Sequence, residues 1–351
     1  MPQPVKIFAN NLKPGQGNSD QRNPAASWKK ELSRATCSAS DLLEQLGLEA
    51  HSRLIEHQPD FRCLVTESYI KKIRAGDIND PLLRQVLPLV EENNPETQQA
   101  GRYDPVGDIN AIASPGLLHK YHGRALLIST GACAIHCRYC FRRHYPYQQS
   151  SCSSSALDEA LNYLESHPEI DEVILSGGDP LVLDNEKLSA LIEQLQTITS
   201  LDTLRIHSRL PVVLPSRIDN SLIQLLKDSR LNVVMVIHSN HANELQQAEQ
   251  ACLSRLHEAG VTLLNQSVLL HGVNDDSGTL ISLSKRLFQC STLPYYLHLL
   301  DPVTGAMHFD VGRQDALRLV SKMQQQLPGY LVPKLVQEIA GKQSKSAIFH
   351  I

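Results

Sequence analysis

The sequence predicts an α/β protein built from six strand–helix units around a mostly parallel sheet. Short β-rich runs lie at residues 124–130, 172–178, 203–209, 232–239, 262–270 and 294–300. Helical stretches alternate with them, at residues 156–167, 185–196, 220–228, 242–260, 277–290 and 314–327. The first of these places its alanines and leucines on one face, as an amphipathic helix does. Six units are too few for a closed eight-stranded barrel, so an open partial barrel and a doubly wound sheet both fit.

Residues just past each strand are the candidates for chemistry, because ligands of both architectures bind at the C-terminal ends of the strands. In this sequence they are Cys133 onward, residues 176–179, His207 to Arg209, His238 to Asn240, and Asp301.

The first 118 residues lack this alternation, and we expect a mostly helical accessory region there, followed by a core domain over residues 119–351. A polar leader rich in Asn, Gly, Gln and Pro covers residues 9–26. A helix is expected within residues 38–48, capped by Ser38 or Ser40. Apolar residues recur at helical spacing over residues 81–92, but Pro88 interrupts the pattern.

Composition indicates an ordinary globular protein. The 351 residues are 42% hydrophobic and 20% charged, and 33 Lys and Arg against 37 Asp and Glu leave a formal net charge of −4. This near balance excludes a broadly polycationic nucleic-acid binder. The longest apolar runs, such as residues 233–237, are too short to span a membrane, and the N-terminus lacks the apolar stretch of a secretory signal. We therefore expect a soluble, cytoplasmic protein with no nucleic-acid or membrane partner.

Three of the eight cysteines fall within one short segment, as Cys133, Cys137 and Cys140, with C-x3-C-x2-C spacing. Three thiolates on one loop can bind three irons of a cubane cluster and leave the fourth iron open to a chelating ligand. The alternative is a structural zinc ion, with His136 or His144 as a further ligand. Zinc modules usually carry a second paired motif, which this chain lacks, so the spacing favours the iron–sulfur cluster.

This motif, placed directly after the first strand, resembles that of the radical S-adenosylmethionine (SAM) superfamily, whose fold is a partial barrel. The segment SGGDPL at residues 176–181 resembles the glycine-rich stretch of that superfamily, whose backbone meets the methionyl amino group. Gly177 and Gly178 permit close approach of the backbone to a ligand, and Asp179 is an acceptor. The resemblance implies a partial (β/α)6 barrel, a 4Fe-4S cluster and SAM.

Within the superfamily, the chain resembles the lysine 2,3-aminomutase family over most of residues 95–348. The matching strings, in order, are HKYHGRALLIST, CAIHCRYCFRRH, ILSGGDPL, SRLPVVLPSRI, HSNHANE, NQSVLLHGVND and YYLHLLDPVTGAMHF. Family members also use pyridoxal 5′-phosphate, and the resemblance places the lysine that binds it at Lys345, in a short C-terminal segment. This chain has GKQS at residues 341–344 where the family has a run of glycines. Lys342 is therefore a rival, but the spacing from Glu338 favours Lys345.

The resemblance also assigns residues that bind the two organic cofactors. Lys120, Tyr121 and Arg124 match the family segment that binds pyridoxal phosphate, for which fixed positive charge is needed. His238 and Gln266 match positions that contact SAM.

The remaining assignments concern the substrate. Arg142 matches the residue that pairs with the substrate carboxylate, for which a guanidinium fork is well suited. Asp301 and Glu338 match the two acidic residues that hold the ammonium group of lysine, with Glu338 in place of the family's usual Asp. Two carboxylates would repel the side chain of glutamate, so this pair favours lysine as substrate.

The resemblance thus implies an isomerase, an L-lysine 2,3-aminomutase that converts (S)-α-lysine into (R)-β-lysine through a 5′-deoxyadenosyl radical and pyridoxal phosphate. The chain ends shortly after Lys345, and with its altered glycine run it resembles the bacterial branch that supplies β-lysine for modification of translation elongation factor P. Its partners would be an electron donor such as flavodoxin or ferredoxin and, functionally, the ligase that attaches β-lysine to elongation factor P.

Other functions stay open at this point. One is a catabolic or osmolyte-producing lysine 2,3-aminomutase, another is a radical SAM enzyme without pyridoxal phosphate, and a third is a non-catalytic zinc or iron–sulfur scaffold. We expect free lysine rather than a lysine within a protein as substrate, because the pocket carries a partner for the substrate carboxylate.

Overall fold

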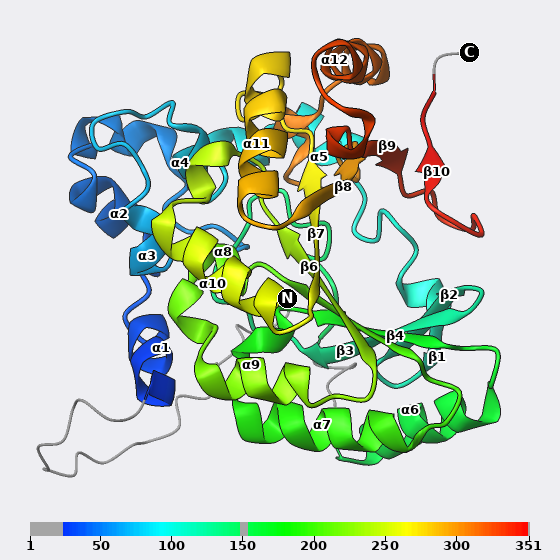
Figure 1. Cartoon of the computed structure of the whole chain (residues 1–351). Helices are drawn as coiled ribbons and strands as arrows, with labels where there is room; N and C mark the ends of the chain where they lie inside the picture. Colours follow the sequence, from blue (N-terminus) through cyan, green and yellow to red (C-terminus); the bar gives the residue numbers. More distant parts are fainter. Residues whose placement is uncertain (1–23, 148–153, 350–351) are drawn as a thin grey trace, which may run out of the picture.

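The computed structural model describes residues 24–147 and 154–349, and a ten-stranded sheet forms its centre (Figure 1). The strands follow one another across the sheet in sequence order. Strands β3 to β9 are parallel, whereas β1 pairs with β2 and β10 pairs with β9 in antiparallel fashion at the two edges. Their bounds are β1 Ile112–Ser114, β2 Leu117–Tyr121, β3 Arg124–Thr130, β4 Glu172–Gly177, β5 Thr203–Ser208, β6 Asn232–His238, β7 Thr262–Val268, β8 Leu293–His298, β9 Lys334–Gln337 and β10 Ser346–Ala347.

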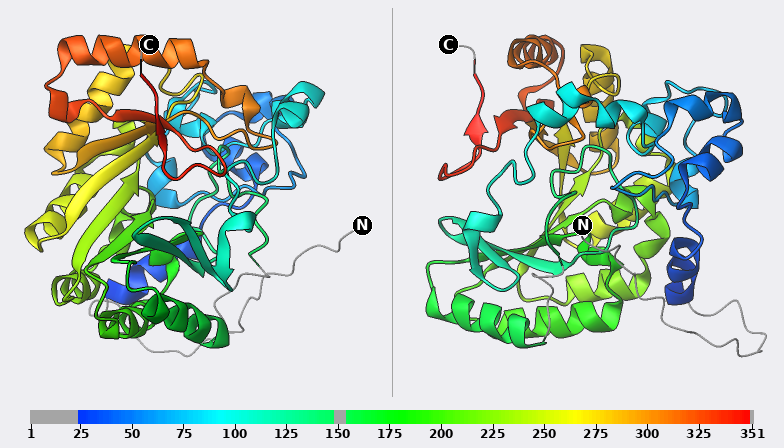
Figure 2. Two further views of the ribbon diagram at one scale, coloured as in Figure 1. Left: turned by 90° about the vertical axis from the view of Figure 1, so that its right-hand side faces the viewer. Right: turned by 180° about the vertical axis from the view of Figure 1, so that it is seen from behind.

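This strand order distinguishes between the two architectures that the sequence allows. Each parallel strand lies beside the next one in the chain, which is the winding of a barrel, whereas a doubly wound sheet reverses its order partway. Among the described residues no pairing joins β1 to β10, so the barrel is open. In Figures 1 and 2 these two edges nevertheless lie on the same side of the molecule. The predicted partial α/β barrel is confirmed, and β9 adds a parallel strand that the sequence pattern does not predict.

The longer helices follow the parallel strands and cover the outer face of the sheet (Figure 1). Asp184, Asp219 and Asp276 cap α7, α9 and α11, each accepting a backbone N–H of the first turn. No helix in the described part of the chain is long and apolar enough to cross a membrane. The helices are α6 Ser154–Ser166, α7 Asn185–Thr197, α8 Leu210–Val213, α9 Asn220–Lys227, α10 Gln247–Glu258, α11 Ser277–Gln289 and α12 Arg313–Gln326, with 3₁₀ turns η4 Pro180–Val182, η5 Pro215–Arg217, η7 Met307–Phe309 and η8 Gly329–Leu331.

The helix predicted over residues 242–260 is wrong in its first part. A 3₁₀ turn, η6 (Ala242–Glu244), precedes α10, which begins only at Gln247. The buried carboxylate of Glu244 turns back and accepts the backbone N–H groups of Asn240 and His241, at 2.7 and 3.0 Å. Because a buried charge must be paired, this local turn and an ion pair with Arg209 at 2.9 Å replace the first helical turn.

The N-terminal region consists of short helices and 3₁₀ turns, and most of the leader expected at residues 9–26 lies outside the described residues. Ser38, rather than Ser40, caps α2 by accepting the N–H of Asp41 at 3.3 Å. Pro88 lies between α4 and η2, where the sequence pattern is interrupted. The elements are α1 Pro24–Leu32, α2 Ala39–Gln45, η1 Glu49–Leu54, α3 Glu67–Ile70, α4 Pro81–Arg84, η2 Val90–Asn93, α5 Pro95–Ala100 and η3 Ile109–Ala111.

One hydrophobic core includes residues from both sides of the boundary expected at residue 118, which itself lies within β2. Leu42 and Leu82 of the N-terminal helices are fully buried in the core that also contains Leu127 of β3. Close by, the buried amine of Lys72 donates to the carbonyl of Val212 at 2.6 Å and pairs with Glu249 at 2.9 Å. The N-terminal region is thus packed into the core of the barrel.

Leu82→Ala should lower the free energy of unfolding by about 2–5 kcal/mol, because it removes buried methyl groups from this shared core. The single tryptophan, Trp28, is buried in the same core and reports on the N-terminal region. Urea denaturation followed by Trp28 fluorescence and by circular dichroism should give coincident transitions, both shifted to lower urea. Leu54→Ala, at an exposed leucine, is the control and should change little. Separate transitions for the two probes would contradict a shared core.

Candidate active site

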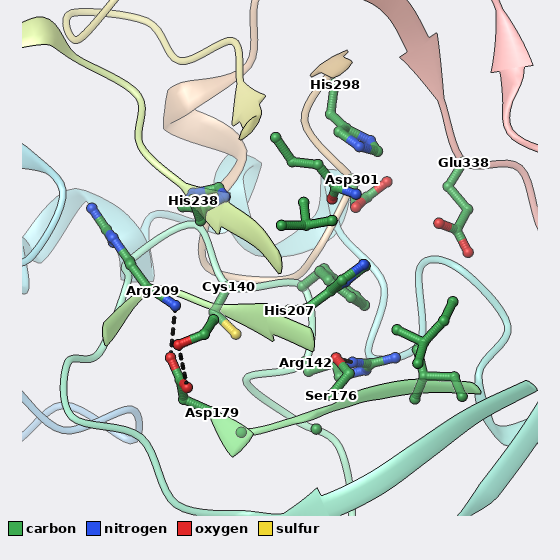
Figure 3. Close-up of a pocket in the computed structure, with 18 of the residues that line it drawn as sticks. Cys140, Arg142, Ser176, Asp179, His207, Arg209, His238, His298, Asp301 and Glu338 are labelled. Carbon is green, nitrogen blue, oxygen red and sulfur yellow. Dashed lines mark hydrogen bonds between the residues drawn. The ribbon is translucent and has the colours of Figure 1, made fainter. Parts of the chain in front are cut away.

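A cavity of about 410 Å³ lies within the barrel, at the C-terminal ends of the parallel strands (Figure 3). Every residue assigned from the sequence lines it: Lys120, Tyr121, Arg124, Cys133, Cys137, Cys140, Arg142, Gly177, Gly178, Asp179, His238, Gln266, Asp301, Glu338 and Lys345. The fold therefore brings the candidates together, although they come from segments more than two hundred residues apart. Their individual roles stay predictions.

The three clustered cysteines lie on the loop that follows β3, and all are free thiols. Arg209, from the loop after β5, donates a hydrogen bond from its guanidinium to the Sγ of Cys137. Within the described residues, no three His, Cys, Asp or Glu side chains are grouped so that they could hold one metal ion. Thiolates that bind a cubane each meet a different iron, so they need not converge on one point.

The two histidines that could complete a zinc site are engaged elsewhere. His136 bonds through Nδ1 to the carbonyl of Arg62 at 2.9 Å, and its ring stacks on Phe61. His144 bonds through Nε2 to the carbonyl of Thr304 at 3.2 Å. Neither lines the cavity that the cysteines line. The structure therefore gives no support to the zinc alternative.

The glycine pair at the end of β4 allows the chain to lie directly against the cysteine loop. Gly177 has a positive φ of 114°, which favours glycine. A Cβ on Gly178 would clash with the carbonyl oxygen of Ala132, so no side chain fits there. The N–H of Asp179 donates to that same carbonyl at 2.8 Å. The strand end and the cysteine loop thus form a backbone-lined wall that a ligand can approach closely.

Asp179 connects this wall to the next strand. Its carboxylate accepts hydrogen bonds from the Ser208 hydroxyl and the Arg209 N–H, both at 2.7 Å, and from the N–H groups of Leu181 and Leu210. Burial raises the pKa of Asp179 to about 6, although these hydrogen bonds oppose the shift. The side chain thus fixes the turn after β5.

His238 and Gln266 lie opposite each other on the adjacent strands β6 and β7. The Nε2 of His238 lies 2.8 Å from the hydroxyl of Tyr139, and burial lowers the pKa of His238 to about 3, so its imidazole is neutral near pH 7. The Nε2 of Gln266 is buried and has no hydrogen-bond partner among the described residues. This unused amide donor is suited to an acceptor on a bound ligand.

Charged side chains of alternating sign form a continuous series along the cavity wall. Arg142 pairs with Asp108 at 2.7 Å, Asp108 with Lys120 at 2.5 Å, Lys120 with Glu338 at 3.0 Å, and Glu338 with Lys345 at 3.4 Å. Burial raises the pKa of Glu338, but Lys345 and Lys120 outweigh it, and the net shift is downward. All of these groups are largely shielded from solvent, and each charge has an opposite neighbour, as burial requires.

Asp301 is the exception, because its buried Oδ1 has no hydrogen-bond partner in the described part of the chain. Burial, together with the nearby charge of Glu338, raises the pKa of Asp301 to about 7, although Lys345 and Lys120 oppose the shift. A carboxylate placed in this way is suited to receive a cationic group from a ligand.

Lys345, and not Lys342, lines the cavity. The short antiparallel pairing of β10 with β9, in which Ser346 lies opposite Gln337, brings Lys345 next to Glu338. The amine of Lys345 also lies 3.3 Å from the Nε2 of His298. Burial lowers the pKa of Lys345, although Glu338 and Asp301 oppose the shift.

Arg124 and Tyr121 lie together where the β2–β3 hairpin meets the cavity. The guanidinium of Arg124 is 4.8 Å from the centre of the Tyr121 ring. Lys120, beside them, is already bound by three acceptors, namely the carboxylates of Asp108 and Glu338 and, at 2.9 Å, the carbonyl of Val106. Arg124 is therefore the more available cation for an anionic ligand.

The cavity is also lined by residues that were not predicted from the sequence, among them Asp108, Tyr139, Tyr296 and His298. Asp108 precedes the barrel and belongs to no motif, so no sequence signal identifies it. His298 ends β8 and could have been selected by the same strand-end rule that selected Asp301.

The chain is similar in sequence to known proteins over most of its length. A family model for the radical SAM superfamily matches residues 127–283. The L-lysine 2,3-aminomutase of Escherichia coli (strain K12) is 42% identical over 324 residues, which cover 92% of this chain and 94% of the relative. Its counterpart in Haemophilus influenzae is 44% identical over 323 residues, covering 91% and 94%. The counterpart in Buchnera aphidicola is 40% identical over 330 residues, covering 93% and 96%.

Asp301→Asn should remove one contribution to the pH dependence of stability in the ligand-free protein. The raised pKa means that the folded state binds more protons than the unfolded chain between about pH 4 and 7. This stabilisation is present below pH 4 and is lost as the pH rises through 7. The free energy of unfolding of the wild type, minus that of Asp301→Asn, should therefore fall by roughly 2–4 kcal/mol over this range when it is measured by urea unfolding.

The amide introduced by Asp301→Asn cannot ionise, so that variant should lack this contribution. Asp315→Asn, at an exposed residue that pairs with Arg318, should keep the wild-type profile. An unchanged slope in Asp301→Asn would mean that this carboxyl titrates normally.

Proposed function

This chain belongs to the lysine 2,3-aminomutase family of the radical SAM superfamily, and we propose that it moves the amino group of L-lysine from Cα to Cβ to form β-lysine. The observation that carries the proposal is one cavity shared by three cysteines with cluster spacing and a shielded lysine amine, Lys345. The proposal includes a 4Fe-4S cluster, SAM and pyridoxal phosphate as cofactors and (R)-β-lysine as product.

The residues present fit each of these groups. The three cysteines supply three thiolate ligands and leave one iron for SAM. The backbone-lined wall at Gly177 and Gly178 suits the methionyl part of SAM. The unpartnered amide of Gln266 suits a hydrogen-bond acceptor elsewhere on SAM. Arg124 and the ring of Tyr121 suit the phosphate and the flat ring of pyridoxal phosphate, and Lys345 supplies the amine for its aldehyde.

When bound, the reduced cluster supplies the electron that cleaves SAM, and pyridoxal phosphate supplies a conjugated ring that delocalises an unpaired electron. The protein would bind these groups, orient them and shield them from solvent. Burial within the barrel excludes water from the reacting groups, which also protects reactive species from side reactions.

Charge complementarity supports lysine as substrate. Arg142 offers a guanidinium for the carboxylate of a free amino acid, and Asp301 offers an unpaired carboxylate oxygen for a distant ammonium. Glutamate would instead bring a second carboxylate beside Asp301 and Glu338.

Lys345 must lose a proton before its amine can react with an aldehyde. Burial favours this loss, because it lowers the pKa of the amine. The Nε2 of His298 at 3.3 Å and the carboxylate of Glu338 at 3.4 Å are polar groups beside this amine.

The biological part of the proposal is a supply of (R)-β-lysine for modification of translation elongation factor P in the cytoplasm. An electron donor of the flavodoxin or ferredoxin class would reduce the cluster, and the elongation factor P lysine ligase would use the product. The altered glycine run before Lys345 supports this branch.

Lys345→Ala should abolish formation of β-lysine, whereas Lys342→Ala should retain it, because only Lys345 lines the cavity. The purified protein would be reconstituted anaerobically with iron and sulfide and given SAM, pyridoxal phosphate, dithionite and lysine, and β-lysine would be measured by chiral chromatography and mass spectrometry. Wild-type protein that forms 5′-deoxyadenosine but no β-lysine would show radical chemistry on another substrate. Equal activity in both variants would overturn the assignment of Lys345.

Cys140→Ala should lose most of the bound iron and the brown colour of the reconstituted protein, because a cubane held by two protein thiolates is weakly bound. Iron analysis and the visible absorption spectrum measure this without any turnover. Cys290→Ala is the matched control, since Cys290 is a buried free thiol outside the cavity. Full iron content in Cys140→Ala would place the cluster elsewhere.

A further inference from the structure

We propose that Asp108 is a positioning residue, which fixes the guanidinium of Arg142 so that the substrate carboxylate meets one defined edge of it. This inference rests on the proposed function, because it concerns recognition of a free amino acid. Asp108 belongs to the N-terminal region and precedes the barrel, yet its side chain lies in the cavity wall.

The loop that carries Asp108 is itself held in place. Asp104 accepts the backbone N–H groups of Asp108 and Ile109, at 2.9 and 3.1 Å. Gly107, which precedes Asp108, has a positive φ of 70°, and a Cβ there would lie 3.1 Å from the Cβ of Ala340 in the C-terminal segment. The loop is thus packed between the barrel and the end of the chain, and Asp108 is only 2% exposed.

Asp108 determines which donors of Arg142 remain available. The Nε of Arg142 donates to Oδ2 of Asp108 at 2.7 Å, and its Nη1 donates to the hydroxyl of Ser176 at 3.0 Å. Among the described residues, the Nη2 of Arg142 has no protein acceptor. A planar guanidinium held at Nε therefore presents its outer edge, Nη1 and Nη2, to a carboxylate in the cavity. Figure 3 shows Arg142 beside Ser176 on the cavity wall.

The charge of Asp108 also separates two cations that would otherwise share one region. Its second oxygen, Oδ1, pairs with Lys120 at 2.5 Å. Burial raises the pKa of Asp108, but Arg142 and Lys120 outweigh it, so the carboxylate is ionised. Without this charge, the ammonium of Lys120 would lose one of its acceptors and could compete with Arg142 for the substrate carboxylate. Asp108 thus makes Arg142 the defined anion site.

The experiment compares lysine with cadaverine, which is lysine without its carboxylate. The protein is loaded with the cluster, SAM and pyridoxal phosphate but is not reduced, so that either compound can bind without turnover. Calorimetry then gives the Kd of each compound. Asp108→Asn should weaken lysine binding about tenfold and leave cadaverine binding within about twofold. In the reduced enzyme, the KM for lysine should rise by a similar factor while kcat changes far less.

Further variants separate positioning from loss of structure. Asp108→Glu keeps the charge and should restore most of the lysine affinity. Ser176→Ala, which removes the other bond to Arg142, should weaken lysine in the same direction but less. Asp315→Asn, at an exposed residue outside the cavity, is the control and should leave the ratio of the two Kd values unchanged. The thermal melting temperature of each variant checks that it is folded.

The outcomes distinguish this inference from the proposed function. Equal weakening of lysine and cadaverine in Asp108→Asn, or no weakening of either, would overturn the positioning role. A second outcome would separate the two proposals. If the wild type binds lysine selectively over cadaverine and Asp108→Asn loses this selectivity, the positioning role is upheld. If the same wild type makes no β-lysine after reduction, the proposed reaction is contradicted.

Discussion

The carboxylate of Asp179 is the constraint on which the rest of the cavity depends. It joins the end of β4 to the turn after β5, because it accepts N–H groups of that turn directly. Arg209 begins this turn and extends from it to Cys137, and its Nη2 also binds Gln85 at 2.8 Å and Glu244 at 2.9 Å. One buried acid and one buried base therefore hold two strand ends, the cysteine loop, an N-terminal helix and the turn after β6 in a single arrangement.

The second organising feature is the series of ion pairs between Arg142 and Lys345. Buried charges must be paired, so cationic side chains inside a barrel require acidic partners. In this series of ion pairs, the parallel strands do not provide the acids. Asp108 comes from the N-terminal region and Glu338 from the segment that follows β9, and each pairs with Lys120. The loop that carries Asp108 and the segment that carries Glu338, which flank the parallel strands in the sequence, are thus held at the cavity by electrostatics.

Six of the parallel strands could be predicted from the sequence, because each is a short apolar run followed by a helical pattern, and the residues at their ends line one cavity. The continuous helix predicted over residues 242–260 is wrong, since the pairing of Glu244 with Arg209 is a tertiary contact that no local pattern reveals. The same limit applies to Asp108, whose partners lie on other segments. Lys345 could be selected over Lys342 only by resemblance, and the hairpin of β9 and β10 gives the physical reason.

The open edge of the barrel has a consequence for how such enzymes diversify. The cysteine loop follows β3 and the glycine pair lies at the end of β4, and these two strands are neighbours in the parallel sheet. Asp108 and Lys345 lie instead on flanking segments that pack over the gap. Part of the cavity wall is therefore supplied by segments that the parallel sheet does not require. A lineage could vary these flanking segments, and so reshape the cavity, while the cysteine loop and the strand end that faces it are inherited unchanged.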